Sequence, residues 1–316
     1  MISPGSEATK DHGRAVITKD GAKVASVPLG QIDSVVVSSK AHLSMPLIFA
    51  LLENGRQIFF VDSFGRLCGA LGKEQVSLER FETQRAVFTA NQNYWIRYVI
   101  NEKLQAQINI LKTYAKRKKE IALADIAGQV KLYKNKLMKH DDINELRGLE
   151  GQAAKCYFSG FAYILDPKVW TWTGRNRRPP RDGVNALLSY GYTLLERDLR
   201  IAIAGAGLDP RLGFFHSNNG RKDSLVYDLL EPFRQPVIDR FILKLLNLGI
   251  FTPADFELAN GGCKMKLATK KRWFERYEEY LETPFQEFQG MSPRQHIRFW
   301  VEKFGLFIFD RGIGDE

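Results

Sequence analysis

Apolar positions near the N-terminus alternate with polar ones, as they do in β-strands. The alternation is clearest at residues 15–18 and 23–27. Between these runs stands the pair Asp20-Gly21, which is typical of the tight turn of a β-hairpin. We therefore expect two antiparallel strands joined by this turn.

Two apolar runs further along predict buried strands, at residues 32–38 and 57–61. Residues 44–53, between them, predict a short helix that ends before Gly55, because glycine accepts the left-handed backbone that commonly closes a helix. Strand and turn signals thus fill roughly the first 80 residues. We interpret residues 1–80 as a small N-terminal domain rich in β-strand.

Further along the chain the apolar positions recur with a helical period that few residues interrupt. The pattern predicts helices over 76–89, 92–119, 144–165 and 182–204. We expect residues 81–316 to form a larger, all-α domain that carries the catalytic site. The expected fold class is therefore α+β.

The composition is ordinary for a soluble globular protein, with 316 residues, 44% of them hydrophobic and 26% charged. No apolar run approaches the roughly 20 residues that a membrane-spanning helix needs, and the segment after Met1 lacks the pattern of a signal peptide. The three cysteines are widely spaced and odd in number, so we expect reduced thiols. These features predict a cytoplasmic protein without a membrane partner.

The formal charge of +10 favours a polyanionic partner, although net charge alone does not separate a nucleic acid from an acidic protein or membrane surface. Nine Lys or Arg lie between Lys112 and Lys139, a run that equally fits a solvated helix face. Other basic residues we assign to DNA binding, because such side chains gain affinity for phosphate by releasing counterions. They are Arg175, Arg177, Arg178, Arg181, Arg221, Lys222, Lys264, Lys266, Lys270 and Lys271.

Three residues in distinctive segments suggest a divalent-metal site, namely Glu150, His216 and Glu231. If Ser224 caps a helix, Asp228 and Glu231 stand three residues apart and project from one face. Two carboxylates and an imidazole fit Mg²⁺ or Mn²⁺, because hard cations prefer oxygen ligands and Mn²⁺ also accepts nitrogen. A tetrahedral zinc site would need more Cys or His than this neighbourhood supplies.

Each of these residues also has a purely structural interpretation. His216 could be a core histidine satisfied by hydrogen bonds, and Glu150 could be an exposed helix carboxylate. Gly148 and Gly151 favour close packing around Glu150, since glycine in a helix costs about 1 kcal/mol relative to alanine. We keep Asp228 as a second acidic residue near the site, because it could simply pair with a neighbouring basic side chain.

The order of these segments resembles the CRISPR-associated endonuclease and integrase of spacer acquisition, the larger of the two adaptation proteins. The resemblance covers nearly the whole chain and rests on a set of short sequence motifs in a fixed order. They are Val27-Pro28-Leu29, Val35-Val36-Val37, Arg147-Gly148-Leu149-Glu150-Gly151, Arg177-Arg178-Pro179-Pro180-Arg181-Asp182-Gly183-Val184-Asn185-Ala186-Leu187-Leu188-Ser189, Gly207-Leu208-Asp209-Pro210, Gly213-Phe214-Phe215-His216-Ser217 and Asp228-Leu229-Leu230-Glu231-Pro232-Phe233-Arg234. Glu196 stands where many relatives carry a tyrosine, so no role of that tyrosine is carried over.

The resemblance implies an N-terminal β domain, a helical catalytic domain, and a homodimer that joins a small ferredoxin-like partner. It also implies that Glu150, His216 and Glu231 hold the metal. The expected reaction is attack by the 3′-hydroxyl of a DNA fragment on a phosphodiester of the CRISPR repeat. Two alternatives stay open: a metal-dependent nuclease or transposon-type integrase that acts without the partner, and a DNA-binding scaffold without catalysis.

Overall fold

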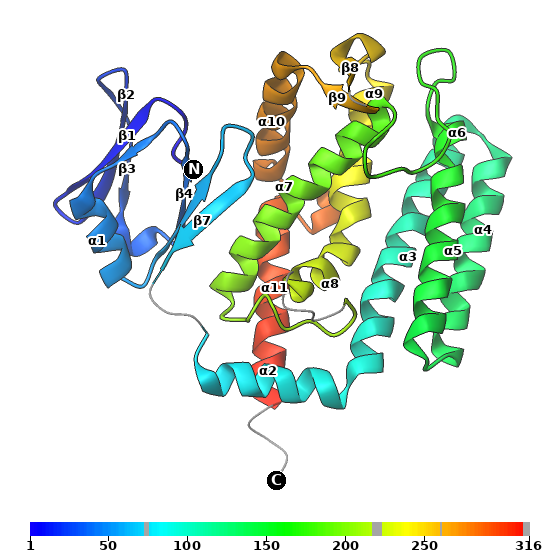
Figure 1. The fold of residues 1–316 in the computed structure, drawn as a ribbon, viewed down its shortest axis with the longest axis horizontal. Helices are drawn as coiled ribbons and strands as arrows, with labels where there is room; N and C mark the ends of the chain where they lie inside the picture. The colour runs from blue at the N-terminus through cyan, green and yellow to red at the C-terminus, as the bar shows by residue number, and fades with distance from the viewer. Residues whose placement is uncertain (73–75, 217–222, 260, 312–316) are drawn as a thin grey trace.

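The structure is a computed structural model that describes residues 1–72, 76–216, 223–259 and 261–311. Strands fill the N-terminal part of the chain and helices fill most of the rest (Figure 1). The predicted order, a strand-rich region followed by a larger helical region, is confirmed. The division of the chain into two domains at residue 80 stays a prediction.

The N-terminal region contains two small sheets and one helix. The elements are β1 (Ser6–Asp11), β2 (Arg14–Lys19), β3 (Ala22–Pro28), a 3₁₀ turn (Leu29–Gln31), β4 (Ser34–Ser38), β5 (His42–Leu43), α1 (Met45–Glu53), β6 (Gln57–Val61) and β7 (Leu67–Leu71). The sheets have the strand orders β3-β2-β1-β5 and β4-β6-β7. The predicted hairpin is β2–β3, and Asp20 and Gly21 both have the positive φ that its turn requires.

The helical region contains the long elements of the fold. They are α2 (Leu78–Ala90), α3 (Gln92–Lys118), α4 (Ile121–Lys136), α5 (Ile143–Ser159), α6 (Phe161–Ile164), α7 (Gly183–Gly205), α8 (Ser224–Phe233), a π-helix (Arg234–Asp239), α9 (Arg240–Asn247), β8 (Phe256–Ala259), β9 (Gly262–Met265), α10 (Leu267–Glu282) and α11 (Pro293–Arg311). Short 3₁₀ turns lie at Leu137–Lys139, Pro253–Asp255 and Gln286–Phe288. The β8–β9 hairpin is one departure from the predicted all-α composition of this region.

The predicted helices 76–89, 92–119 and 182–204 correspond to α2, α3 and α7 within two residues at either end. The predicted helix over 144–165 is instead divided into α5 and α6 at Gly160. A Cβ on Gly160 would lie 2.6 Å from Leu111 Cδ2 on α3, so glycine at the end of α5 allows the two helices to come close together.

α3 occupies a central position in the helical region. It packs against α4 and α5 on one side and against α8 on another, while α8 also contacts α7 (Figure 1). The buried side of α3 repeats at helical spacing and includes Ile96, Ile100, Leu104 and Ile108. α5 and α8, far apart in sequence, therefore face the same central helix.

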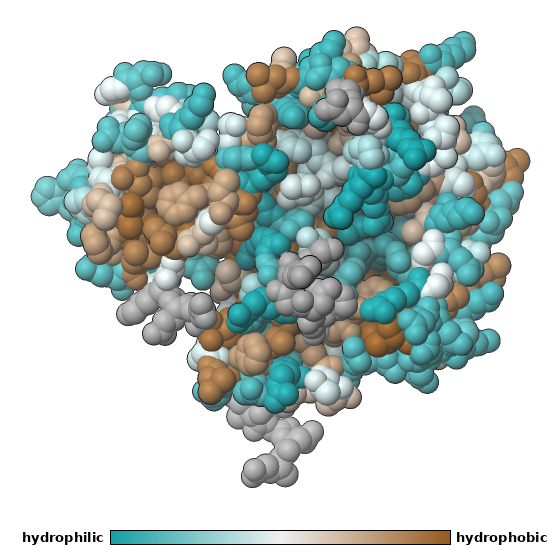
Figure 2. Space-filling model, in the orientation of Figure 1, coloured by the Kyte–Doolittle hydropathy of each residue, from teal (hydrophilic) through white to brown (hydrophobic). Residues whose placement is uncertain are grey.

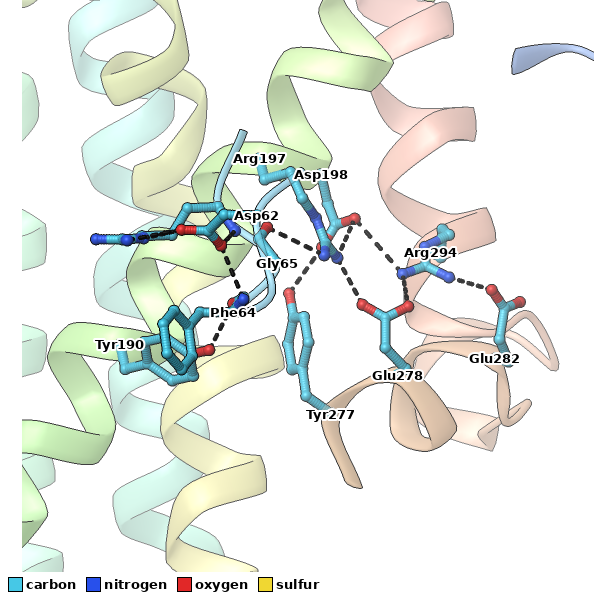
Figure 3. A network of polar contacts seen from close by, with 11 residues as sticks. Asp62, Phe64, Gly65, Tyr190, Arg197, Asp198, Tyr277, Glu278, Glu282 and Arg294 are labelled. Carbon is cyan, nitrogen blue, oxygen red and sulfur yellow. Dashed lines mark hydrogen bonds and ion pairs between the residues drawn. The ribbon is translucent and has the colours of Figure 1, made fainter. Parts of the chain in front are cut away.

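The two regions meet where the turn between β6 and β7 lies against α7 (Figure 3). Tyr190 on α7 donates a hydrogen bond to the carbonyl of Phe64 over 2.5 Å, and Arg197 Nη1 donates to the carbonyl of Gly65 over 3.3 Å. Gly65 has φ +76°, and a Cβ there would lie 2.3 Å from Phe274 Cε2. Only glycine fits this turn against the helical region.

Hydrophilic residues cover much of the helical region on the face seen in Figure 2, whereas apolar side chains gather on the N-terminal region. Met45 and Phe49 on α1 are among the exposed large apolar residues. None of the helices in the described ranges combines the length and the apolar character needed to cross a membrane.

Candidate metal centre

Asp228 on α8 anchors the loop that carries His216. Its carboxylate is completely buried and accepts hydrogen bonds from the backbone N–H groups of Phe214, Phe215 and His216, over 2.7, 3.0 and 2.8 Å. A Cβ on Gly213 would lie 2.5 Å from Asp228 Oδ2, so glycine is required for the loop to come this close. Asp228 thus sets the path of the backbone up to the histidine.

The same carboxylate orients the imidazole of His216. Nδ1 of His216 lies 2.6 Å from Asp228 Oδ1, and a carboxylate can only accept in this contact. Nδ1 therefore carries the proton, and the lone pair of Nε2 is directed away from Asp228. The side chain of His216 is 40% exposed, which excludes the interpretation of a core histidine.

Ser224 does not cap α8 as expected. The helix begins at Ser224 itself, with Asp223 in the N-cap position. The hydroxyl of Ser224 accepts a hydrogen bond from Gly213 N over 3.0 Å and donates one to the carbonyl of Arg211 over 2.6 Å. Ser224 therefore fastens the loop before His216 to the helix that carries Asp228 and Glu231.

Glu150 on α5 and Glu231 on α8 meet at a third residue, Lys103 on α3. The ammonium of Lys103 donates hydrogen bonds to Glu150 Oε1 and, over 2.5 Å, to Glu231 Oε2. Glu231 Oε1 lies 3.3 Å from Arg234 Nη2. Lys103, Glu231 and Arg234 are almost completely buried, whereas the side chain of Glu150 is 21% exposed.

Burial and neighbouring charges act in opposite directions on these groups. Burial raises the pKa of the Glu231 carboxyl, but Arg234 and Lys103 outweigh burial and lower that pKa to about 2. Burial lowers the pKa of the Lys103 ammonium, and the two glutamates outweigh it and raise that pKa above its usual value. His216 is close enough to contribute to the shift at Glu231. The buried pair of Lys103 and Glu231 is therefore ionised around neutral pH.

The three predicted ligands are thus gathered in one neighbourhood, but with a lysine between two of them. Within the described ranges, no three His, Cys, Asp or Glu side chains form a ready metal-binding group. The donor chemistry fits Mg²⁺ or Mn²⁺, because two carboxylates and a correctly oriented imidazole nitrogen are present. The ammonium of Lys103 shows that the space between the carboxylates attracts a cation.

Neighbouring residues hold the loop and α5 together. Arg147, three residues before Glu150, donates from Nη2 to the carbonyl of Phe215 over 2.6 Å, and Gln92 donates to the carbonyl of Phe214 over 2.8 Å. The expectation of close packing at Gly148 and Gly151 is wrong: both are exposed, and a Cβ there would meet nothing within 4 Å. They leave open backbone beside Glu150.

A further buried carboxylate, which the sequence did not reveal, lies near Arg234. Asp239, in the π-helix, accepts hydrogen bonds from Tyr192 over 2.5 Å and from Tyr157 over 3.0 Å. Burial raises the pKa of Asp239 to about 6, although both tyrosines and the nearby Arg175 act to lower it. The Arg234 guanidinium lies 5.0 Å from the centre of the Tyr192 ring, which connects this cluster to Glu231.

The residues assigned to DNA binding are placed in different ways. Arg175 is held inside its own loop, because its guanidinium donates to Asn185 Oδ1 over 2.8 Å and to Ser189 Oγ over 3.1 Å. The Lys270 ammonium lies 4.9 Å from the centre of the Phe64 ring. Arg221 and Lys222 fall outside the described residues. The exposed members of the set are Arg177, Arg178, Arg181, Lys264, Lys266 and Lys271.

Glu196, where many relatives carry a tyrosine, points to other charged and polar groups. It accepts a hydrogen bond from Arg200 over 2.8 Å and another from the hydroxyl of Tyr227 over 3.3 Å. The Tyr227 ring lies 5.9 Å from the imidazole of His216, between their centres. Glu196 is therefore linked to His216, one of the candidate metal ligands, through one intervening side chain.

Comparisons with known proteins decide the family. The model of the family described as CRISPR associated protein Cas1 matches residues 1–279. The chain belongs to this family. The CRISPR-associated endonuclease Cas1 1 of Thermus thermophilus is 34% identical over 270 residues, which are 85% of this chain and 82% of the relative. The Cas1 1 endonuclease of Chlorobaculum tepidum is 31% identical over 338 residues, 98% of this chain and 97% of the relative.

Solved structures share the Cas1 fold over nearly the whole chain. A CAS1 protein from Thermotoga maritima superposes with a TM-score of 0.73 at 23% identity, covering 100% of this chain and 98% of that one. A casposase bound to an integration product gives 0.74 at 22% identity, with 98% and 89% covered. A chain of a partial Cas6-RT-Cas1–Cas2 complex gives 0.77 at 21% identity, with 98% and 95% covered.

Proposed function

We propose that the protein is a divalent-metal-dependent DNA endonuclease and integrase that inserts short DNA fragments into a CRISPR repeat array. The observation that carries the proposal is the meeting of Glu150 and Glu231 around a cation, beside a histidine oriented by Asp228. Membership of the Cas1 family and the names of its endonuclease relatives support it.

Glu150, Glu231 and Nε2 of His216 would hold Mg²⁺ or Mn²⁺. The bound ion would polarise the phosphoryl oxygen and stabilise the charge of the leaving alkoxide. Asp228 keeps the proton on Nδ1 of His216, so that Nε2 stays available as a ligand. Arg234 holds one oxygen of Glu231 from the side of the protein interior, which fixes the direction of the other.

The reaction would be a transesterification. The 3′-hydroxyl of the fragment forms a new P–O bond with a phosphate of the repeat, and the bond from that phosphate to its own 3′-oxygen breaks. The number of phosphodiester bonds is unchanged, so no external energy source is needed. With water as the attacking group, the same site would cut DNA instead.

The surroundings of the site suit a DNA backbone. Open helix backbone at Gly148 and Gly151 leaves room next to Glu150. Arg177, Arg178 and Arg181 are exposed and available to phosphates, which position a duplex without reading its sequence. Arg175 instead shapes the loop from which these side chains project.

The proposed assembly is a homodimer that joins a small ferredoxin-like adaptation protein. The match to a chain in a Cas6-RT-Cas1–Cas2 complex supports a partner of this kind, and the apolar surface of the N-terminal region suits contact with a second protein surface (Figure 2). Light scattering during size-exclusion chromatography would give twice the chain mass of 36.1 kDa for the homodimer. The chain mass itself would contradict this part of the proposal.

The decisive experiment is a strand-transfer assay with short duplexes and a supercoiled plasmid that carries a repeat. It compares Mg²⁺, Mn²⁺ and a chelator, with and without the small partner. The critical variant is Glu150→Gln, and its matched control is Glu145→Gln, an exposed glutamate on the same helix. We expect transfer to need both a metal and the partner, to be lost in Glu150→Gln, and to persist in Glu145→Gln.

Other outcomes point to the alternatives. Transfer or cutting that does not need the partner would favour a transposon-type integrase or a simple nuclease. DNA binding without any chemistry in all metals would favour a non-catalytic scaffold. Full activity in Glu150→Gln would remove this residue from the metal site.

A further inference from the structure

Lys103 is a buried cation that the proposed reaction does not use. It lies in the middle of α3 and is only 3% exposed. Lysine is rarely buried unless its charge is paired. Here it is paired twice, with Glu150 Oε1 and with Glu231 Oε2, so one ammonium bridges the two carboxylates that are proposed to bind the metal.

Both oxygens of Glu231 are already in contact with cations of the protein. Oε2 accepts from Lys103, and Oε1 lies 3.3 Å from Arg234 Nη2. An ammonium and a divalent cation bind to the same lone pairs of a carboxylate, and their like charges repel strongly at contact distance. The affinity of these oxygens for a divalent ion is therefore lower while Lys103 keeps both hydrogen bonds.

We propose that Lys103 is an internal competitor for the metal, which occupies the space between Glu150 and Glu231 until a divalent ion draws the carboxylates away from it. This inference rests on the proposed function, because it takes the two glutamates to be metal ligands. Lys103 would hold α5 and α8 together in the metal-free protein. It would also raise the metal concentration at which the site becomes loaded.

The choice of lysine suits this role. The ammonium of lysine is a compact charge at the end of a flexible chain with rotatable donors, so it can give up one partner and keep the other. The planar fork of arginine would form a more rigid pair with the carboxylates. The nearby Arg234 shows the contrast, since it contacts one glutamate from a fixed position one helical turn away.

The test measures Mn²⁺ binding by isothermal titration calorimetry, without DNA, in wild type, Lys103→Met and Lys103→Gln. Lys116→Met is the matched control, because Lys116 lies on the same helix and is exposed. Removing a positive charge next to the site should strengthen Mn²⁺ binding at least tenfold in both Lys103 variants. The Kd of Lys116→Met should stay within about twofold of wild type.

An unchanged Kd in the Lys103 variants would overturn the proposal. A weaker Kd would overturn it as well, and would show that Lys103 positions the carboxylates for the metal. If wild type neither binds Mn²⁺ nor transfers strands, the proposed function itself has failed. If wild type does both and only the expected gain is missing, this inference alone is wrong.

A second measurement covers the case in which neither Lys103 variant folds. In wild-type protein with ¹⁵N-labelled lysine, a buried and hydrogen-bonded ammonium exchanges its protons slowly and gives a distinct Nζ signal. Saturating Mg²⁺ should shift or remove the signal of Lys103 and leave those of exposed lysines in place. A Lys103 signal that Mg²⁺ does not change would overturn the proposal.

Discussion

Two buried clusters of charge in the helical region each contain one cation that bridges two carboxylates. They differ in how many further partners those carboxylates have. In one, Lys103 bridges Glu150 and Glu231. In the other, Arg197 bridges Asp198, over 2.9 and 3.0 Å, and Glu278, over 2.7 Å (Figure 3). Both cations are almost completely buried, so burial alone does not distinguish a functional cluster from a structural one.

The difference lies in what surrounds the carboxylates. Asp198 also accepts from Tyr277 over 2.9 Å, and Glu278 also accepts from Arg294 over 2.7 Å (Figure 3). In the cluster around Lys103, the only charged partner of Glu150 within the described residues is Lys103, although its side chain is about as exposed as that of Glu278. The neighbouring His216 side chain is 40% exposed. A cluster in which fixed guanidinium groups satisfy every carboxylate is structural. A carboxylate held by one lysine, as Glu150 is, can exchange its cation.

The largest expected effect on stability comes from breaking the cluster around Arg197, which we call the closed cluster. Arg197→Met removes the buried cation that pairs with Asp198 and Glu278, so that Arg294 remains as their shared cation. It also removes the contact with Gly65 of the N-terminal region. We expect a loss of about 3 to 5 kcal/mol in the free energy of unfolding, measured by urea denaturation. Arg276→Met, which removes an exposed pair with Glu279, should change it by less than about 1 kcal/mol. Equal losses in both variants would contradict the comparison.

The buried carboxylate of Asp239, which no cation bridges within the described residues, should make the stability of the protein depend on pH. The pKa of Asp239 is raised to about 6, so the folded protein binds this proton more tightly than the unfolded chain does. Its contribution to stability is present below about pH 4 and is lost as the pH rises through about 6. Asp239→Asn should therefore be more stable than wild type at about pH 8, by about 3 kcal/mol at most, and similar at about pH 4. A gap that is the same at both pH values in urea denaturation would contradict this assignment.

In the cluster around Lys103, a change of Asp228, the residue that orients His216, should lower the activity. Asp228→Asn no longer holds the proton on Nδ1 of His216 with a charge, so strand transfer should fall about 10- to 100-fold. Asp239→Asn is the matched control, because it removes an equally buried carboxylate whose hydrogen-bond partners are Tyr157 and Tyr192 rather than His216. Initial rates at saturating Mg²⁺ would measure both. Similar losses in the two variants would indicate a general effect on the fold.

The smallest expected effect concerns the junction that the closed cluster supports. Tyr190→Phe removes the hydrogen bond to the carbonyl of Phe64 and keeps the ring in place. We expect a loss of about 1 kcal/mol in the free energy of unfolding, with strand transfer at saturating metal unchanged. A large loss of strand transfer would show that the placement of the N-terminal region also affects the cluster around Lys103.

Local pattern was sufficient where an element is made by its own residues. The β2–β3 hairpin was predictable from Asp20-Gly21, and α3 from an apolar period that continues over 27 residues. The division between α5 and α6 was not predictable: it falls at Gly160, where the lack of a Cβ lets Leu111 of α3 come close. Contacts of this kind depend on residues that are distant in sequence.

The part played by Lys103 was missed for a related reason. Among 46 lysines and arginines, nothing local separates it from residues that face solvent. One signal was present: Lys103 stands on the apolar side of α3, directly between Ile100 and Leu104. A charge at a core position of an otherwise amphipathic helix predicts a buried partner, but the pattern does not name that partner.

Short stretches of sequence were sufficient to predict a strand-rich region followed by a helical one, and the motifs around Glu150, His216 and Glu231 indicated the family and the candidate ligands. Those are properties of short segments, which can be interpreted without knowledge of the fold. The packed fold was needed to show that Asp228 orients the histidine, that Arg175 is held within its own loop, and that Lys103 lies between the two glutamates. Each of these depends on which helices pack together, and packing is decided by the whole core rather than by any one segment.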